Sequence, residues 1–178
     1  MPEWIEDPAL KLRMRFERLA EDLAGEVEVE PGGGIGKHFH PRQDELWTVR
    51  EGKARFQLGR SKRLLEAGEE VLVPAGVRHA LKNVGDRTAR LRFTIKPALE
   101  LEPFLLEAAA LNRERKVTSF GIPTSFGALL DGATFIDRYK DTCVLVFPPP
   151  FPPPALQPLA FAPLARLARR RRASQGRQ

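Results

Sequence analysis

The segment from Gly32 to Gly52 constrains this chain more than any other, because it brings two histidines and a carboxylate close together. Side chains alternate between the two faces of a strand, so His38 and His40 are expected to point the same way and form a chelating pair. Glu45 begins a β-rich run that ends at a glycine. A turn over residues 41–44 would fold this second strand back alongside the first and return the carboxylate to the histidines.

A second segment, from Gly68 to Asn83, contains the third histidine of the chain, His79. A Pro-Ala-Gly sequence precedes it and predicts a tight turn, because proline fixes one backbone dihedral angle and glycine allows a positive one. Two or three neutral imidazoles and one carboxylate suit iron(II), manganese, nickel, copper or zinc, and the absence of thiolates disfavours a structural zinc site. The two segments predict one divalent transition metal with coordination positions left open for chemistry.

Together these segments resemble the paired motifs of the cupin superfamily, G-x5-HxH-x3,4-E-x6-G and G-x5-PxG-x2-H-x3-N. The positions of both motifs are filled by Gly32, His38, His40, Glu45, Gly52, Gly68, Pro74, Gly76, His79 and Asn83. The resemblance covers at most residues 10–97. It implies an all-β double-stranded β-helix, or jelly-roll barrel, with a metal held by His38, His40, Glu45 and His79. It does not imply one reaction, since cupins include dioxygenases, isomerases, epimerases, decarboxylases, storage proteins and sugar-binding modules.

Alternating residues predict the other barrel strands. Residues 10–19 fit both a strand and one face of a helix, and their residue types favour a helix. The resemblance favours a strand leading into the barrel, and a strand is our prediction. The alternation in residues 26–30 predicts the next strand, and that in residues 91–95 predicts the last.

An apolar pocket is expected around the metal. If Glu45 faces into the barrel, the side chains two and four positions later share its face. Aromatic residues at inward positions of other strands would complete the lining. The predicted pocket residues are Phe16, Trp47, Val49, Phe56 and Phe93.

Pro97 marks a change of architecture, which divides the chain into a barrel (1–97), a helical extension packed on the barrel (98–147) and a C-terminal segment (148–178). Helices are expected over residues 99–115 and 125–140. The sequence PPPFPPP, residues 148–154, predicts an extended polyproline segment. Residues 155–168 predict a short helix docked on the barrel, with an amphipathic segment at an anionic membrane surface as the alternative. The arginines that follow predict a solvated, disordered end.

Composition and charge limit the kinds of partner and compartment that we expect for this chain. The net charge of +6 equals the arginines that follow Asp141, the last acidic residue, so the barrel itself is neutral. A neutral barrel gives no reason to expect a nucleic-acid partner. The single cysteine, Cys143, excludes an internal disulfide and favours the cytoplasm. No apolar run is long enough to cross a membrane.

These observations lead to one functional hypothesis, a mononuclear metal cupin that acts on a small organic molecule as a dioxygenase or isomerase. All three histidines are used as ligands, and the one tyrosine, Tyr139, is expected outside the barrel. A histidine-tyrosine acid/base pair is therefore disfavoured. The alternative is a non-catalytic module that binds or senses a small molecule. Homodimer formation is left open.

Overall fold

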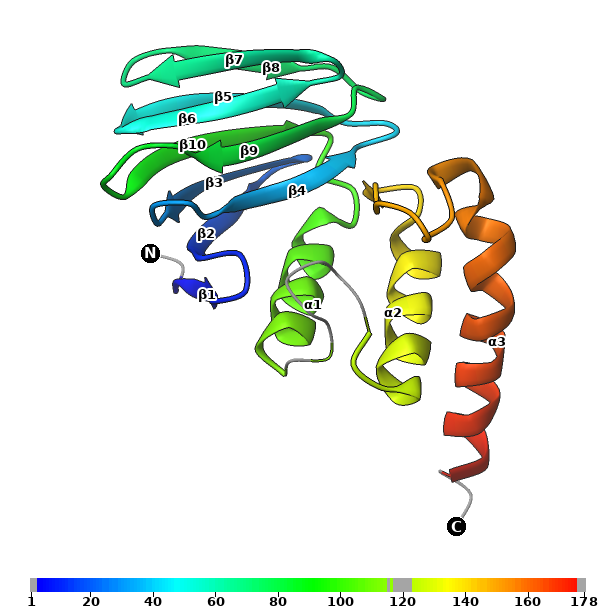
Figure 1. Ribbon diagram of the computed structural model, residues 1–178. Coiled ribbons are helices and arrows are strands. Elements are labelled where there is room, and N and C mark those ends of the chain that lie inside the picture. The colour runs from blue at the N-terminus through cyan, green and yellow to red at the C-terminus, as the bar shows by residue number, and fades with distance from the viewer. Residues whose placement is uncertain (1–2, 115, 117–122, 176–178) are drawn as a thin grey trace.

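The computed structural model describes residues 3–114, 116 and 123–175. Figure 1 shows two layers of strands beside a group of helices. The first sheet has the strand order β1-β2-β3-β10-β5-β8. Its strands are β1 Ile5–Asp7, β2 Leu12–Leu19, β3 Asp22–Val29, β10 Ala89–Lys96, β5 Asp44–Glu51 and β8 Glu70–Val73.

The second sheet has the strand order β11-β4-β9-β6-β7. Its strands are β11 Val144–Leu145, β4 Gly34–Phe39, β9 His79–Asn83, β6 Lys53–Leu58 and β7 Ser61–Glu66. The neighbouring strands whose registers are resolved pair antiparallel in both sheets. The predicted fold class, a double-stranded β-helix with a helical extension, is confirmed.

The core lies between the sheets because apolar residues alternate with polar ones along the strands. In β10 the side chains of Ala89, Leu91, Phe93 and Ile95 are buried, while the arginines between them are exposed. The first half of β2 follows the same alternation and pairs with β3, so the strand prediction for this segment is confirmed. The helical alternative is wrong.

The turn after His40 does not form the predicted hairpin. Strand β4 pairs with β9 and β11, whereas β5 pairs with β10 and β8 in the other sheet. Both hydrogen-bonding edges of β4 are already occupied, so the chain crosses to the opposite layer. Glu45 therefore meets the histidines across the interior of the barrel.

The side chain of Asn83 stabilises a turn. Its Nδ2 donates to the carbonyl oxygens of Val29 and Arg87 at 2.8 Å each, and its Oδ1 accepts from the amide of Gly85 at 2.8 Å. These bonds join the end of β9 to the end of β3. The second motif thus contributes to the barrel framework as well as to the histidine group.

Two helices follow the barrel as predicted, α1 over Leu101–Arg113 and α2 over Phe126–Tyr139. The hydroxyl of Ser125 caps α2 by accepting from the amide of Ala128 at 3.1 Å. After α2 the chain adds strand β11 to the outer edge of β4, with Leu145 opposite His38. This strand was not predicted, and it makes the extension part of the second sheet.

The proline-rich segment is not fully extended. The amide of Phe151 donates to the carbonyl oxygen of Pro148 at 3.2 Å, which closes a turn, and a short 3-10 helix, η1, spans Pro154–Leu156. The rings of Phe147 and Phe151 lie 5.2 Å apart across this turn. Prolines lack an amide hydrogen but keep their carbonyl oxygens, so the phenylalanine between them supplies the donor.

The last helix, α3 over Gln157–Gln175, is longer than predicted and packs mainly against α2 rather than on the barrel. Phe161 and Ala165 are buried on either side of Pro163, and this packing holds the helix together around the proline. No helix in the described ranges is long and apolar enough to span a membrane.

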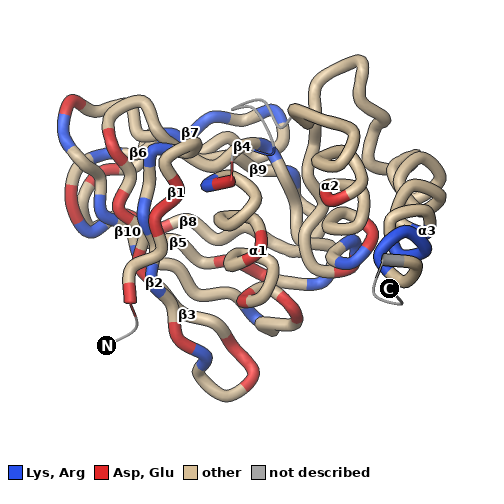
Figure 2. The backbone as a smooth tube through the Cα atoms, turned by 90° about the horizontal axis from the view of Figure 1, so that it is seen from below, with Lys and Arg blue, Asp and Glu red and all other residues tan. Residues whose placement is uncertain are grey.

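The arginine cluster continues α3 instead of forming a disordered end. Figure 2 shows the basic residues that gather on this helix. Arg169 lies 3.2 Å from a carboxylate oxygen of Asp137, and Arg172 lies 2.6 Å from one of Asp131. Both acidic residues belong to α2, so opposite charges align the two helices.

Candidate metal centre

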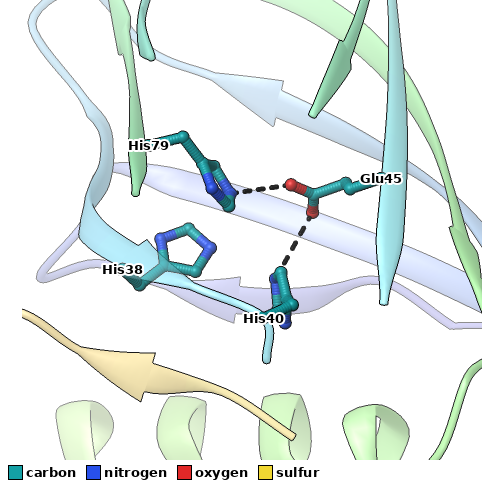
Figure 3. A group of neighbouring side chains, drawn as sticks. All are labelled: His38, His40, Glu45 and His79. Carbon is teal, nitrogen blue, oxygen red and sulfur yellow. Dashed lines mark ion pairs between the residues drawn. The ribbon is translucent and has the colours of Figure 1, made fainter. Parts of the chain in front are cut away.

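The four predicted ligands meet in the barrel interior. His38 lies in β4, His40 directly follows that strand, His79 begins β9, and Glu45 lies in β5 of the opposite sheet. One nitrogen or oxygen atom from each side chain falls within 4.8 Å of the others, and all four residues are buried. Figure 3 shows the side chains pointing toward one another. The fold therefore gathers every ligand candidate that the motifs indicate.

Backbone carbonyl groups orient all three imidazoles. The Nδ1 atom of His38 lies 2.9 Å from the carbonyl oxygen of Gly36, and that of His79 lies 2.9 Å from the carbonyl oxygen of Val77. The Nδ1 atom of His40 lies 2.9 Å from the carbonyl oxygen of Thr142. A carbonyl oxygen only accepts, so each Nδ1 carries a hydrogen and the Nε2 atoms are the ones available to a metal. Such contacts are typical of histidines that bind metals.

Glu45 lies between two of these nitrogens. Its Oε2 is 2.7 Å from Nε2 of His79, and its Oε1 is 3.8 Å from Nε2 of His40. Despite the short distance, neither Oε2 of Glu45 nor Nε2 of His79 has a hydrogen bond of acceptable geometry among the described residues. Buried polar atoms without such bonds are rare. Their convergence fits a shared positive ion, so the residues present suit a metal.

The pKa values agree with a metal-binding state. Burial, reinforced by the neighbouring histidines, lowers the pKa of His38 to about 3, and burial also lowers the pKa of His40. Burial opposes ionisation of Glu45, but the close approach of the His79 imidazole and the other two imidazoles lower its pKa to about 2. Burial opposes protonation of His79 as well, yet Glu45 raises the pKa of this imidazole. A metal would replace the proton that His79 and Glu45 otherwise share.

A cavity of about 420 Å³ adjoins this group. Trp47 and Phe93 line it, as the sequence suggested. The other three predicted pocket residues, Phe16, Val49 and Phe56, are buried in the core but are not part of the described lining. The ring of Phe56 packs 5.9 Å from that of Trp47, which places it behind the cavity wall.

Much of the cavity wall comes from the extension, which the pocket prediction did not include. The contributing side chains are mostly apolar and come from α1, α2, the segment around β11 and α3. They include Phe104, Leu105, Phe135, Ile136, Leu145, Phe147, Phe151 and Phe161. The apolar spacing of three and four residues in α1 and α2 indicated buried helix faces, but nothing local showed which surface they would cover.

Comparison with known proteins agrees with this architecture. Residues 25–96 match the family model described as the cupin domain. Among curated proteins, the chain is 35% identical over 69 residues to "Polyketide synthase CurC" of Streptomyces cyaneus, covering 39% of this chain and 45% of that protein. It is 33% identical over 73 residues to "Tetracenomycin polyketide synthase protein TcmJ" of Streptomyces glaucescens, covering 41% and 49%. The chain thus spans about half the length of these relatives.

A solved structure shows the same fold. An RmlC-like cupin from Shewanella frigidimarina superposes with a TM-score of 0.51 at 24% identity, covering 57% of this chain and 88% of that one. The match, the two complete motifs and the jelly-roll topology all concern the same segment. Residues 25–96 therefore match a cupin domain in sequence, and the barrel that contains them has the cupin fold.

Proposed function

We propose that this protein binds one divalent transition metal through His38, His40, Glu45 and His79 and uses it to transform a small, largely apolar organic molecule. The observation that carries the proposal is the preorganised group of three imidazoles, each with Nδ1 held by a carbonyl oxygen, around one carboxylate. When bound, a metal with open coordination positions supplies Lewis acidity or redox chemistry. The reaction classes that suit this group are oxygenation and isomerisation.

The cavity supports an apolar substrate. Aromatic and aliphatic side chains make up most of its lining, and the metal group forms a polar patch on one side. Pockets of a few hundred Å³ with an apolar wall and a few polar groups are typical of small-molecule sites. Two curated relatives carry the words polyketide synthase in their names. We infer a ring-containing, polyketide-like molecule as the substrate class, since such molecules combine an apolar body with oxygen atoms that bind metals.

The chain's own residues would position that molecule. Trp47 and Phe93, whose rings lie 5.3 Å apart, offer flat surfaces inside the barrel. Phe104 and Phe135, whose rings lie 5.0 Å apart, offer a second aromatic pair from the extension. Both pairs line the cavity and keep water from its apolar part. A substrate held between these pairs would present an oxygen atom to the metal group.

The proposal is tested first by metal analysis of the full chain. Glu45→Gln removes the carboxylate charge with little change in shape, and we expect a loss of metal affinity of more than about 100-fold, which is beyond the effect of losing an outer contact. Glu51→Gln is the matched control, because Glu51 lies in the same strand with its side chain 61% exposed. Bound metal is quantified by mass spectrometry after dialysis. Full metal retention by Glu45→Gln would contradict the site.

Turnover is tested separately. The metal-free protein is reloaded with iron(II), manganese, nickel, copper or zinc and given a panel of phenolic and diketone compounds. Oxygen uptake reports oxygenation, and absorbance changes without oxygen uptake report isomerisation. Turnover should follow metal content and be lost in Glu45→Gln. Tight binding of panel compounds without turnover by any metal form would instead assign a binding or sensing function.

A further inference from the structure

We propose that Asp7 is a second ligand contact in the cavity and accepts a hydrogen bond from a hydroxyl group of the bound molecule, with Asn112 holding the carboxylate in place. This inference rests on the proposed function in one respect, that the cavity is the ligand site. It adds a requirement on the ligand, a hydroxyl group at the end far from the metal group.

The surroundings of Asp7 carry the proposal. Asp7 lines the cavity and is only 1% exposed. Its Oδ1 accepts from the amide of Leu10 at 3.1 Å, and its Oδ2 accepts from Nδ2 of Asn112 at 2.7 Å. In the described part of the chain no Lys or Arg forms an ion pair with it. The two carboxylate oxygens have about four lone-pair sites between them, so acceptor capacity remains for a further donor even with the backbone amides of Leu10 and Ala9 and the amide of Asn112 bound.

A buried carboxylate whose hydrogen-bond donors are all neutral is unfavourable, because burial removes it from water. Burial raises the pKa of Asp7, and the donors Asn112, Leu10 and Ala9 together with the charge of Arg113 offset this only in part. The turn that Oδ1 closes with Leu10 needs an acceptor but not a charge, so asparagine would serve there equally well. A hydroxyl group from a ligand would satisfy the remaining acceptor capacity. The negative charge thus has a use in binding that the turn alone does not explain.

Helix α1 places Asp7 far from the metal group. Residues 101, 104, 105, 108, 111 and 112 line the cavity, so one face of the helix follows it from end to end. At a rise of 1.5 Å per residue, Leu101 and Asn112 are about 16 Å apart. The Leu101 end is near the metal group, because Nε2 of Gln43, in the loop between His40 and Glu45, donates to the carbonyl oxygen of Ala98 at 2.8 Å.

The sheet register supports the same placement. Asp7 pairs with Leu12, which pairs with Val29 in β3. Glu45 pairs with Ile95, which pairs with Leu23 at the other end of β3. Val29 and Leu23 are six residues apart along β3, so Asp7 and Glu45 are separated by roughly 20 Å along the strand direction. The cavity therefore has two polar ends with an apolar stretch between them, and it fits an elongated ligand that binds the metal at one end and carries a hydroxyl group at the other.

The experiment compares two probes, para-hydroxybiphenyl, which has a hydrogen-bond donor, and para-methoxybiphenyl, in which a methyl group replaces the donor hydrogen. Their affinities for the full chain are measured by tryptophan fluorescence quenching, since Trp47 lines the cavity, and by calorimetry. We expect the wild-type protein to prefer the hydroxyl probe by about tenfold or more, as for a hydrogen bond to a charged group. Asp7→Asn keeps an acceptor for the Leu10 amide, and we expect the preference to fall below about threefold.

Two controls separate this inference from the proposed function. Asp22→Asn removes a carboxylate that pairs with Lys96 outside the cavity lining, at 2.8 Å, and should keep the full preference. His38→Ala should lose metal but also keep the preference, because the hydroxyl contact is at the other end. Thermal melting and circular dichroism show whether each variant folds.

Several results would overturn the inference. Equal affinity of the wild-type protein for the two probes would do so without any variant, as would failure of both probes to bind. A full preference retained in folded Asp7→Asn would also contradict it. A preference lost in His38→Ala but kept in Asp7→Asn would assign the hydroxyl contact to the metal end instead.

Discussion

His38 and His79 are each held by a carbonyl oxygen two residues earlier in the chain, whereas His40 is held by the carbonyl oxygen of Thr142 in the extension. The cavity is also divided between these two regions. Its polar group comes from the cupin segment, and its apolar wall comes largely from the helices of the extension. Short-range geometry thus fixes two of the three imidazoles, and long-range packing fixes the third imidazole and the shape of the space beside the metal group. The metal group should tolerate changes in the extension that leave the Thr142 contact in place, even where they alter the cavity and the stability.

The strongest test of this contrast removes an aromatic ring from the extension. Phe104 is 7% exposed and contacts the rings of Phe135 and Tyr139 at 5.0 and 5.5 Å. We expect Phe104→Ala to lower the free energy of unfolding by about 3–5 kcal/mol, because it leaves a void in the packed wall. Urea denaturation followed by circular dichroism measures the loss. Metal stoichiometry below the transition should stay unchanged.

The matched control is Leu106→Ala, in the same helix, where the side chain is 46% exposed. It should change the free energy of unfolding by less than about 1 kcal/mol. A loss of bound metal in Phe104→Ala, measured at denaturant concentrations where the variant remains folded, would show that the metal group depends on packing in the extension.

A pH titration tests the burial of the histidines in the metal group. The pKa of His38 is about 3 in the folded protein against an ordinary value of 6.5. Between these two pH values the unfolded chain binds a proton on this imidazole and the folded chain does not. The stability that His38 contributes to the metal-free protein should therefore be fully present above pH 6.5 and fall as the pH drops toward 3, by at most about 1.4 kcal/mol per pH unit. His40 acts in the same direction, since burial lowers its pKa too. The raised pKa of His79 acts in the opposite direction, because its contribution is present at low pH and is lost as the pH rises.

Denaturant midpoints measured at intervals of pH check this expectation, and His38→Ala should flatten the profile. The depressed pKa of Glu45, about 2, adds to the loss only below its ordinary value of 4.5. A profile that is unchanged in His38→Ala would contradict the assigned burial of this imidazole.

The smallest expected effect concerns the ion pairs between α2 and α3. Arg172 lies 2.6 Å from Asp131, but its side chain is 63% exposed. Exposed pairs contribute little, so Arg172→Ala should change the free energy of unfolding by less than about 1 kcal/mol and leave metal content unaltered. Thermal melting at low and high salt measures this. A loss of more than about 2 kcal/mol would show that the arginine cluster holds the extension in place.

The sequence predicted most of the barrel because its evidence is local. Alternation in β2 and β10 depends only on neighbouring residues, and the motif spacings are short enough to identify the ligand candidates in or next to β4, β5 and β9. The hairpin prediction after His40 was wrong because pairing partners are decided by the whole sheet. Strands β9 and β11 occupy both edges of β4, and neither is adjacent to it in sequence.

The pocket was harder to predict for the same reason. Inward-facing positions such as Val49 and Phe56 satisfy the alternation equally well whether they face a cavity or fill the core. The distinction depends on where the helices end and what they cover, which no local pattern records. The arginines after residue 168 were assigned to a disordered end because their acidic partners lie about 35 residues earlier in α2.

The pairing of β11 with β4 also bears on how the protein avoids self-association. Without this short strand, β4 would be the edge of its sheet and would present unpaired backbone groups beside His38. Exposed edge strands are templates on which a second chain can add. Val144 and Leu145 therefore cover the part of β4 that contains His38, and the edge on this side of the sheet passes to a strand of two residues, which offers a second chain little backbone to pair with.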